Sequence, residues 1–187
     1  MGQEDDLIPR AAKGDWEALA RLLGRHEGPL FGFFYRLGCH PNWVEDLVQE
    51  VMIRLYQARH RYDPSRPFSA WLYGIARNVW RDHARRRGRE EGHVTALESP
   101  EEIPSTAADP LERSQQGEEA ERVRRALQRL PEEERMTLIL RHYQGLTYEE
   151  IAEALGVPLG TVKWRIHDAV RKMGAWLSVR EGRMAKE

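Results

Sequence analysis

Residues 147–173 read TYEEIAEALGVPLGTVKWRIHDAVRKM and predict a helix, a tight turn and a second helix. Thr147 stands at the N-cap of the first helix with Glu150 three residues on, which is the spacing of a capping box. Gly156 follows where the turn requires a positive φ, and Ala152 is small where the two helices are expected to cross. The apolar residues expected to form their shared core are Ile151, Leu155, Val157, Val162 and Ile166.

This pattern is typical of a DNA-binding helix-turn-helix, whose second helix enters the major groove N-terminus first. The alternative is an αα-hairpin that packs against protein. Arg165 is placed to read guanine and Lys163 to hold a phosphate. Trp164 either enters the groove or packs against the preceding helix, and Asp168 is expected to pair with Lys172. The residues expected to face bases and phosphates are Thr161 (also the predicted cap of the second helix), Lys163, Trp164, Arg165 and His167.

The rest of the chain also predicts helices. Alternating runs of Val, Ile and Thr are absent, whereas apolar residues recur with the 3.6-residue period of a helix. A helix capped by Asp15 is expected to continue to Tyr35, bent or broken at Gly28-Pro29, and Gly88 is a candidate C-cap further on. We therefore predict an all-α fold of two small helical domains joined by an acidic flexible linker, with the helix-turn-helix in the C-terminal domain.

The formal net charge of −1 conceals a strong segregation of charge. Residues 51–89 hold ten arginines and two acids, whereas residues 90–121 hold ten acids and one arginine. Basic blocks separated by an acidic one indicate two contacts with a polyanion, joined by a tether. The expected divisions are a domain over residues 1–90, a linker over 91–117 with at most a weak helical turn at Leu111, a domain over 118–180 and a tail over 181–187.

A helix predicted between Trp43 and Gln57 carries two stripes. Its apolar residues fall on one side, which indicates a buried face. An isoleucine within the neighbouring acidic and amide stripe indicates a docking surface for a partner helix. The alternative is a solvated face with one stray isoleucine. The residues of this second stripe are Asp46, Gln49, Glu50 and Ile53.

Aromatic rings and arginines interleave between Tyr56 and Trp80. Duplex DNA needs only cations, whereas a single strand also offers unstacked base faces, which rings cover at about 1–3 kcal/mol per base. A surface of rings and arginines would therefore trap an opened strand. The alternative is ordinary core aromatics beside a solvated basic helix, and Phe68 and Trp71 are the rings expected in the core.

Composition excludes several classes of protein. No apolar run approaches the roughly 20 residues of a membrane helix, and the acidic start Met1–Asp6 is not a signal peptide, so we expect a cytoplasmic protein without membrane insertion. A single cysteine, Cys39, excludes an internal disulfide, and no ligand cluster indicates a metal or other cofactor. No phosphate loop or nucleophile elbow occurs, and the adjacent Cys39-His40 pair rarely forms a catalytic dyad, so no enzyme is predicted.

A helix-turn-helix repressor or activator that binds duplex DNA as a dimer is a second interpretation. It accounts for residues 122–187 but leaves the first 90 residues without a role. Such a dimer would recognise two-fold half-sites and would bind DNA without polymerase.

Taken together, the motifs resemble the extracytoplasmic-function (ECF, group 4) sigma factors of the bacterial sigma-70 family, which are promoter-specificity subunits of RNA polymerase. Trp164 and Asp168 depart from that family, which usually has Ser at the first position and often Arg at the second. The resemblance is carried by residues 45–51, similar to the polymerase-docking helix; residues 68–87, similar to the promoter-opening region; Leu130-Pro131 and Arg135, similar to the start of the C-terminal domain; and residues 145–163, similar to the helix-turn-helix.

The resemblance implies a division of labour between a σ2 and a σ4 domain. The σ2 domain would dock on the β′ coiled coil of core RNA polymerase through Asp46, Gln49, Glu50 and Ile53. The σ4 domain would read the −35 element of promoter DNA and touch the β flap, the acidic linker would follow the RNA path, and an anti-sigma factor would be a further partner. Contacts to the opened −10 strand are implied for Arg61, Tyr62, Ser65, Arg66, Trp71, Arg77, Asn78, Arg81 and Arg85. Contacts to the −35 element are implied for Thr147, Thr161, Lys163, Trp164, Arg165 and His167.

Overall fold

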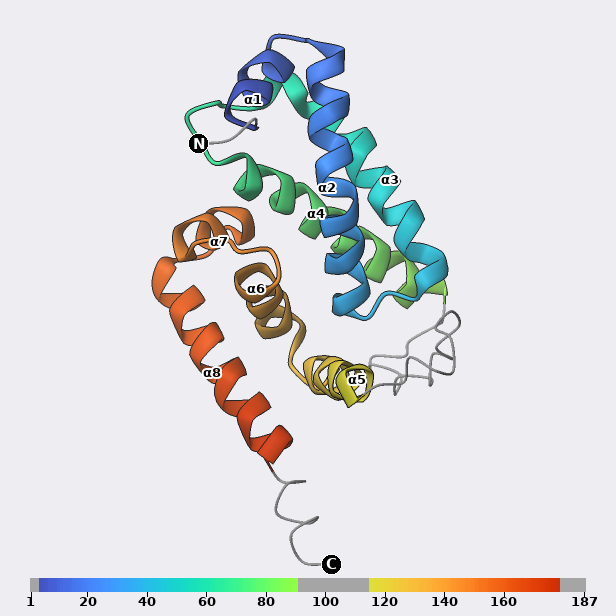
Figure 1. Cartoon of the computed structure of the whole chain (residues 1–187), viewed down its shortest axis with the longest axis vertical. Helices are drawn as coiled ribbons and strands as arrows, with labels where there is room; N and C mark the ends of the chain where they lie inside the picture. Colours follow the sequence, from blue (N-terminus) through green and yellow to red (C-terminus); the bar gives the residue numbers. More distant parts are fainter. Residues whose placement is uncertain (1–3, 91–114, 179–187) are drawn as a thin grey trace, which may run out of the picture.

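The computed structural model of this 187-residue chain describes residues 4–90 and 115–178. All regular structure in these ranges is helical, which confirms the all-α fold. The elements are α1 (Glu4–Ala12), α2 (Trp16–Leu37), α3 (Pro41–Ala58), the 3-10 turn η1 (Arg59–Arg61), α4 (Phe68–Glu90), α5 (Gln115–Gln128), α6 (Glu132–His142), α7 (Tyr148–Leu155) and α8 (Leu159–Ser178). In Figure 1, α1–α4 form one group and α5–α8 a second group that lies against it.

Helix α2 continues through Gly28 and Pro29, where the sequence predicted a bend or break. A proline inside a helix removes one backbone hydrogen bond and costs about 3 kcal/mol. Leu22 precedes this point and Leu30 and Phe33 follow it, and all three are completely or almost completely buried. Gly28 and Pro29 themselves face solvent. Packing on both sides of the proline therefore keeps the helix continuous.

Two other helix ends differ from the predictions. Gly88 lies inside α4, which ends at Glu90 instead of being capped by the glycine. Helix α8 begins at Leu159, two residues before the predicted cap Thr161. The Thr161 amide already donates a hydrogen bond of 2.9 Å to the carbonyl of Pro158, so the first turn forms earlier than the capping residue suggested. The weak helical turn predicted at Leu111 lies outside the described residues.

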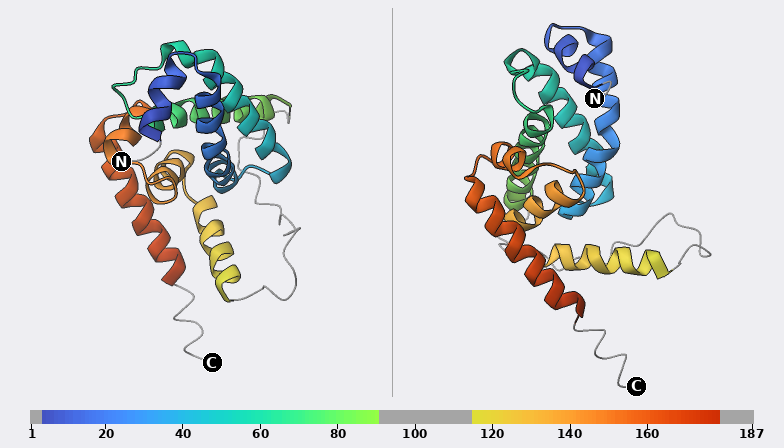
Figure 2. Two further views of the ribbon diagram at one scale, coloured as in Figure 1. Left: turned by 45° about the horizontal axis from the view of Figure 1, so that its top comes forward. Right: turned by 60° about the vertical axis from the view of Figure 1, so that its left-hand side comes forward.

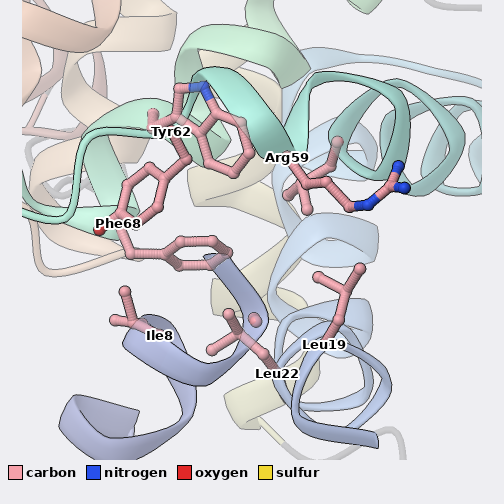
Figure 3. A pocket seen from close by; sticks show the side chains of 9 residues that line it. Ile8, Leu19, Leu22, Arg59, Tyr62 and Phe68 are labelled. Atoms are coloured by element: carbon pink, nitrogen blue, oxygen red, sulfur yellow. The ribbon is translucent and has the colours of Figure 1, made fainter. Parts of the chain in front are cut away.

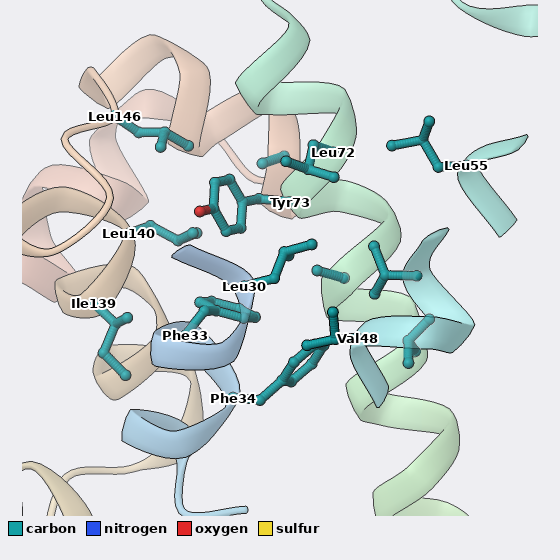
Figure 4. Close-up of a cluster of buried hydrophobic side chains, with 14 of the residues drawn as sticks. Leu30, Phe33, Phe34, Val48, Leu55, Leu72, Tyr73, Ile139, Leu140 and Leu146 are labelled. Carbon is teal, nitrogen blue, oxygen red and sulfur yellow. The ribbon is translucent and has the colours of Figure 1, made fainter. Parts of the chain in front are cut away.

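One apolar core runs through both groups of helices. Leu30 and Phe33 of α2 gather with Tyr73 of α4 and with Ile139 and Leu140 of α6, as Figure 4 shows. Each of these side chains is at most 3% exposed. The two helical units thus share buried surface and are packed on each other.

A second, smaller core holds the C-terminal helices together. It consists of Leu127 of α5, Leu130 just after that helix, Leu138 of α6 and Ala169 of α8. Figure 2 shows α7 beside the start of α4 in both views, with α5 and α8 projecting away from the N-terminal helices. The helix-turn-helix therefore presents its first helix to the N-terminal unit.

Candidate nucleic-acid interface

Helix α3 has one buried face and one exposed face, as its two stripes predicted. Val44, Val51 and Leu55 on the first stripe are fully buried. On the other side Gln49 is exposed and Ile53 leaves 51% of its surface in solvent. The half-exposed Ile53 stands beside polar neighbours, which is typical of a surface that docks a partner helix.

A groove of about 390 Å³ follows this face between α2 and α3. It combines apolar walls with polar groups, a composition that suits the edge of an amphipathic partner helix. Its lining includes Leu23, Val48, Met52 and Ile53, with the polar Glu27 and Gln49.

Glu50 on the same stripe is engaged within the protein. Its carboxylate accepts a 2.7 Å hydrogen bond from Nε of Arg54, and Arg54 also donates at 2.7 Å to Asp82 of α4. The hydrogen bond from Arg54 is the main reason why the pKa of Asp82 lies below its ordinary value. The three side chains together tie α3 to α4. Asp46, also on the stripe, is exposed.

The loop before α4 is folded over an apolar pocket. Tyr62 lies with its ring centroid 4.8 Å from that of Trp71 and 5.8 Å from that of Phe68. Figure 3 shows Tyr62 and Phe68 beside Ile8 of α1 and Leu22 of α2. Phe68 is buried, whereas Tyr62 and Trp71 are half-buried and so keep part of their rings accessible.

Polar contacts hold the conformation of this loop. The Tyr62 hydroxyl donates a hydrogen bond of 2.9 Å to the carbonyl of Arg66. The Asp63 carboxylate accepts hydrogen bonds from the Ser65 hydroxyl at 2.7 Å and from its amide at 2.9 Å, and these lower the pKa of Asp63. Arg61, Ser65 and Arg66 are exposed. The loop is therefore ordered while its cations face outward.

Further along, α4 carries the other residues implied in strand binding. Asn78 and Arg81 are exposed, and Arg85 is exposed with a 2.6 Å contact to Asp82. Arg77 is half-buried, its Nε has no hydrogen-bond partner in the described structure, and burial lowers its pKa. The Arg77 guanidinium therefore keeps one buried N–H donor, at Nε, that no acceptor in the described structure satisfies.

The helix-turn-helix forms as predicted. The Thr147 amide donates to the Glu150 carboxylate at 2.7 Å and the Glu150 amide donates to the Thr147 hydroxyl at 3.2 Å, which is a complete capping box. Gly156 adopts the left-handed conformation at φ +62°. Ile151 and Val162 are fully buried between the helices.

Side chains of α8 differ in how far they are available to DNA. Lys163 and His167 are exposed, and Trp164 is 60% exposed instead of packing on the preceding helix. Thr161 is half-buried. Arg165, predicted to read guanine, leaves only 16% of its side chain exposed.

Arg165 is held by an acid of α6 in the same C-terminal unit. Its Nη1 donates a hydrogen bond of 2.8 Å to Glu133 of α6, and the same carboxylate lies 3.6 Å from Arg81 of α4. Glu133 thus joins a residue implied at the −35 element to one implied at the −10 element. Asp168 pairs with Lys172 at 2.8 Å, as its spacing predicted.

The two surfaces meet at an interface between α4 and α7. The Ser69 hydroxyl donates a hydrogen bond of 2.5 Å to Glu150, and the Tyr73 hydroxyl donates at 2.6 Å to Gln144 in the loop before α7. Arg66 contacts Glu153 at 3.2 Å. We call this set of contacts the α4–α7 interface.

Several residues of these surfaces escaped the sequence analysis. Tyr73, Gln144 and Glu133 gave no periodic or motif signal for a contact between domains. Trp16 and Tyr56 are exposed rings in edge-on contact, with centroids 5.3 Å apart. The two residues are 40 positions apart in the sequence, so no local pattern predicts their contact. The only signal was that Tyr56 begins a segment rich in aromatic residues.

The described part of the chain has neither a metal-binding cluster nor a membrane-spanning helix. Within residues 4–90 and 115–178, no group of three or more His, Cys, Asp or Glu side chains is arranged to hold a metal ion. The helices in those ranges are too short or too polar to cross a membrane.

Comparisons with known proteins agree with both halves of this geometry. The sigma-70 region 2 family model matches residues 22–90 and the sigma-70 region 4 model matches residues 120–173. The RNA polymerase sigma-H factor of Pseudomonas aeruginosa is 33% identical over 183 residues, covering 89% of this chain and 90% of that protein. The ECF RNA polymerase sigma factor SigE of Mycolicibacterium smegmatis is 34% identical over 90% of this chain, which spans 64% of that relative's length.

A solved structure shows the same fold. The sigma factor RpoE of Bartonella quintana, crystallised with the anti-sigma factor NepR, superposes with a TM-score of 0.71 at 26% identity. The match covers 86% of this chain and 96% of that one.

Proposed function

The chain belongs to the ECF sigma factors of RNA polymerase, a family of transcription initiation factors. We propose that its two helical units bind two separate elements of one promoter. The observation that carries this proposal is the pairing of two different surfaces. One combines half-buried rings with exposed arginines and an exposed Asn78, and the other is a complete helix-turn-helix.

The exposed face of α3 docks on core RNA polymerase. Ile53 would insert beside the edge of the β′ coiled coil, with Asp46 and Gln49 contacting polar groups around it. The groove next to Ile53 supports this, because it offers apolar area to a partner helix. Glu50 acts by a different route, since it holds Arg54, and Arg54 in turn bonds Asp82 and ties α3 to α4.

The loop and α4 capture the opened −10 strand. Tyr62 and Trp71 cover an extruded base with the accessible parts of their rings, which is worth about 1–3 kcal/mol per base. Arg61, Ser65 and Arg66 contact the adjoining phosphates and sugars. On α4, Asn78 offers an amide that pairs with a base edge, while Arg77, Arg81 and Arg85 supply cations along the strand.

Helix α8 reads the −35 element in the major groove. Lys163 and His167 are accessible to phosphates, and Trp164 stands where it meets a base edge or sugar. Thr147 and Thr161 contact the backbone near the ends of the two helices. Arg165 reaches a base only after it leaves Glu133. The σ4 unit also touches the β flap.

The proposed divisions follow the sequence. Residues 1–90 form the σ2 unit, residues 91–117 the linker, residues 118–180 the σ4 unit and residues 181–187 a tail. The end of this linker overlaps the start of α5, which begins at Gln115. The acidity of the linker sequence suits a path inside the polymerase that RNA later occupies, because a chain of carboxylates has the charge of a nucleic acid.

This sigma factor works in the cytoplasm, where it binds core polymerase and promoter DNA. An anti-sigma factor is a further partner, by analogy with RpoE of Bartonella quintana. It catalyses no reaction of its own and needs no cofactor, since the polymerase carries the chemistry of RNA synthesis.

Run-off transcription with core polymerase and a promoter library tests the function. We expect transcripts from a subset of promoters that share two elements, and none from core polymerase alone. A helix-turn-helix repressor dimer would give no transcripts and would select a palindrome instead. A library without enrichment in the presence of the protein would contradict the proposal.

A further inference from the structure

Two exposed aromatic rings meet where the start of α2 lies beside the end of α3. Trp16 leaves 63% of its surface in solvent and Tyr56 leaves 40%. Their ring centroids are 5.3 Å apart and the ring planes are perpendicular, so the edge of one ring faces the other. Neighbouring exposed rings form an apolar patch, and such a patch commonly marks a binding surface.

A cation lies against the same pair of rings. Cζ of the Arg59 guanidinium lies 4.0 Å from the centroid of the Tyr56 ring, and its Nη1 donates a hydrogen bond of 2.7 Å to the Tyr56 carbonyl. A guanidinium carries five N–H groups, so this bond leaves donors for the oxygen of a phosphate. We call Trp16, Tyr56 and Arg59 the ring–arginine cluster.

The acids on either side of Trp16 in the sequence are paired within the protein. The Arg10 guanidinium donates to the Asp15 carboxylate at 2.7 and 2.9 Å. The Arg21 guanidinium donates to the Glu17 carboxylate at 2.6 Å. Because each carboxylate has a cation beside it, the two acids repel a polyanion at the cluster less than unpaired carboxylates would.

The cluster continues the surface that is proposed to bind the opened strand. Arg59 lines one apolar pocket together with Tyr62 and Trp71. Figure 3 shows the Arg59 side chain extending away from Tyr62, and its guanidinium ends over the Tyr56 ring. Rings and a cation therefore follow one another along this surface in the order Trp71, Tyr62, Arg59, Tyr56 and Trp16.

Charge distinguishes the cluster from the face of α3 that is proposed to dock on polymerase. Asp46 and Glu50 lie on that face, whereas Tyr56 is followed by the three basic residues of η1. His60 and Arg61 of that turn are exposed. A single nucleic-acid strand is a polyanion with unstacked apolar bases, so it matches a surface of rings and cations better than a protein helix does.

We propose that the ring–arginine cluster is a second base-stacking site for the opened promoter strand, and that it takes a nucleotide adjoining the −10 element. The base stacks on the exposed Trp16 ring, which Tyr56 supports, and Arg59 contacts the neighbouring phosphate. This inference rests on the proposed function, because the strand reaches the cluster by passing over Tyr62 and Trp71. The strand then runs from α4 across the loop onto the start of α2.

Fluorescent single strands bound to the assembled holoenzyme test the site. One strand ends at the −10 element, and two others extend it by a few nucleotides on the 5′ or the 3′ side. We expect one extension to tighten binding about tenfold, which is the order of magnitude that one stacked base contributes. Trp16→Ala should remove this gain, and Trp16→Phe, which keeps a ring, should retain most of it.

Phe31→Ala is the matched control. Phe31 is a ring on the same helix with 39% of its surface exposed, and it lies outside the cluster. This variant should keep the gain from the extension. Equal losses of the gain in Phe31→Ala and Trp16→Ala would show a general effect of removing a ring from α2 and would contradict the assigned site.

2-Aminopurine placed in the extension gives a second readout that needs no variant. Its fluorescence falls when the base stacks on a ring, so we expect quenching at one position of the extension in the parent holoenzyme and recovery with Trp16→Ala. Bright 2-aminopurine at every position, or quenching that persists in Trp16→Ala, would overturn the inference.

The remaining outcomes separate this inference from the proposed function. If the cluster contacts polymerase instead of DNA, Trp16→Ala weakens assembly with core polymerase and neither extension tightens binding, which overturns the inference. Holoenzyme that binds the short strand, but gains nothing from either extension, also overturns it while the proposed function stands. Holoenzyme that binds none of the strands would contradict the proposed function, and the inference with it.

Discussion

The Ser69 hydroxyl on α4 donates a hydrogen bond of 2.5 Å to the Glu150 carboxylate on α7, across 81 positions of sequence. The same carboxylate completes the capping box with Thr147. Glu150 therefore both starts the helix-turn-helix and fastens it to the N-terminal unit. Burial raises and these hydrogen bonds lower the pKa of Glu150, and the net result lies below its ordinary value.

Replacing Ser69 by alanine should weaken the α4–α7 interface. Glu150 would keep its capping role but lose its donor from α4, so we expect the free energy of unfolding to fall by about 1 kcal/mol. Urea unfolding monitored by tryptophan fluorescence measures this change. Ser178→Ala, at an exposed site near the end of α8, is the matched control and should change stability less. Equal losses in the two variants would argue against a structural role for the Ser69 contact.

Docking on polymerase should depend on Ile53 more than on its charged neighbours. Ile53→Ala removes most of the apolar side chain that projects beside the α2–α3 groove, and we expect core binding to weaken by about 1–3 kcal/mol. Competition with a labelled sigma factor for core polymerase measures the affinity. Val170→Ala on α8, which is likewise 50% exposed, is the control. If Val170→Ala weakens core binding as much as Ile53→Ala does, the docking face has been misplaced.

Asn78→Ala should impair promoter opening and spare the closed complex. The exposed amide is proposed to hold an extruded base, which has no counterpart before the strands separate. Permanganate reactivity of the −10 thymines should fall, while band shifts of the closed complex remain. A template with a pre-melted −10 region should restore transcription by the variant. No rescue by that template would place the defect elsewhere.

Lys163→Ala should weaken −35 binding similarly for all sequences. An exposed lysine that holds one phosphate contributes about one unit to the slope of log affinity against log salt. Titrations of holoenzyme binding at several salt concentrations test this. Trp164→Ser, in contrast, should change the preferred −35 sequence. A salt slope that stays at the parent value would show that Lys163 does not reach the DNA.

Acid sensitivity should follow the Arg54–Asp82 pair. The hydrogen bond from Arg54 lowers the folded-state pKa of Asp82, so the unfolded chain binds more protons at acid pH. The stability that this carboxylate contributes is present above its ordinary pKa and is lost as the pH falls through the lowered folded value. Asp82→Asn should therefore make the free energy of unfolding less dependent on pH below 4. An unchanged acid profile would contradict the assigned pKa shift.

Local signals in the sequence predicted the elements of the fold well. The capping box of Thr147 and Glu150 and the left-handed Gly156 act over three to ten residues, so their pattern is visible without the tertiary structure. The apolar stripe of α3 likewise depends only on helical period. The prediction of a bend or break at Pro29 was wrong. Leu22 and Leu30 on either side of the proline are buried, and this burial outweighs the lost backbone hydrogen bond. Only the packed structure shows that burial.

Contacts between helices that are distant in the sequence could not be predicted in the same way. Ser69 and Glu150 are 81 residues apart and Arg165 and Glu133 are 32 apart, and neither pair follows a helical or turn spacing. Arg165 was assigned to DNA because its place on the second helix is that of a reading residue, but a nearby acid holds it in the free chain. Such pairings arise from how the helices pack, and a single sequence carries no direct signal for them.

Footprinting of one promoter with the protein alone, with core polymerase alone and with both together tests the central claim most directly. The account predicts protection of the −35 and −10 regions, with permanganate-reactive thymines at −10, only when protein and polymerase are both present. Protection of a palindromic site by the protein without polymerase would contradict it.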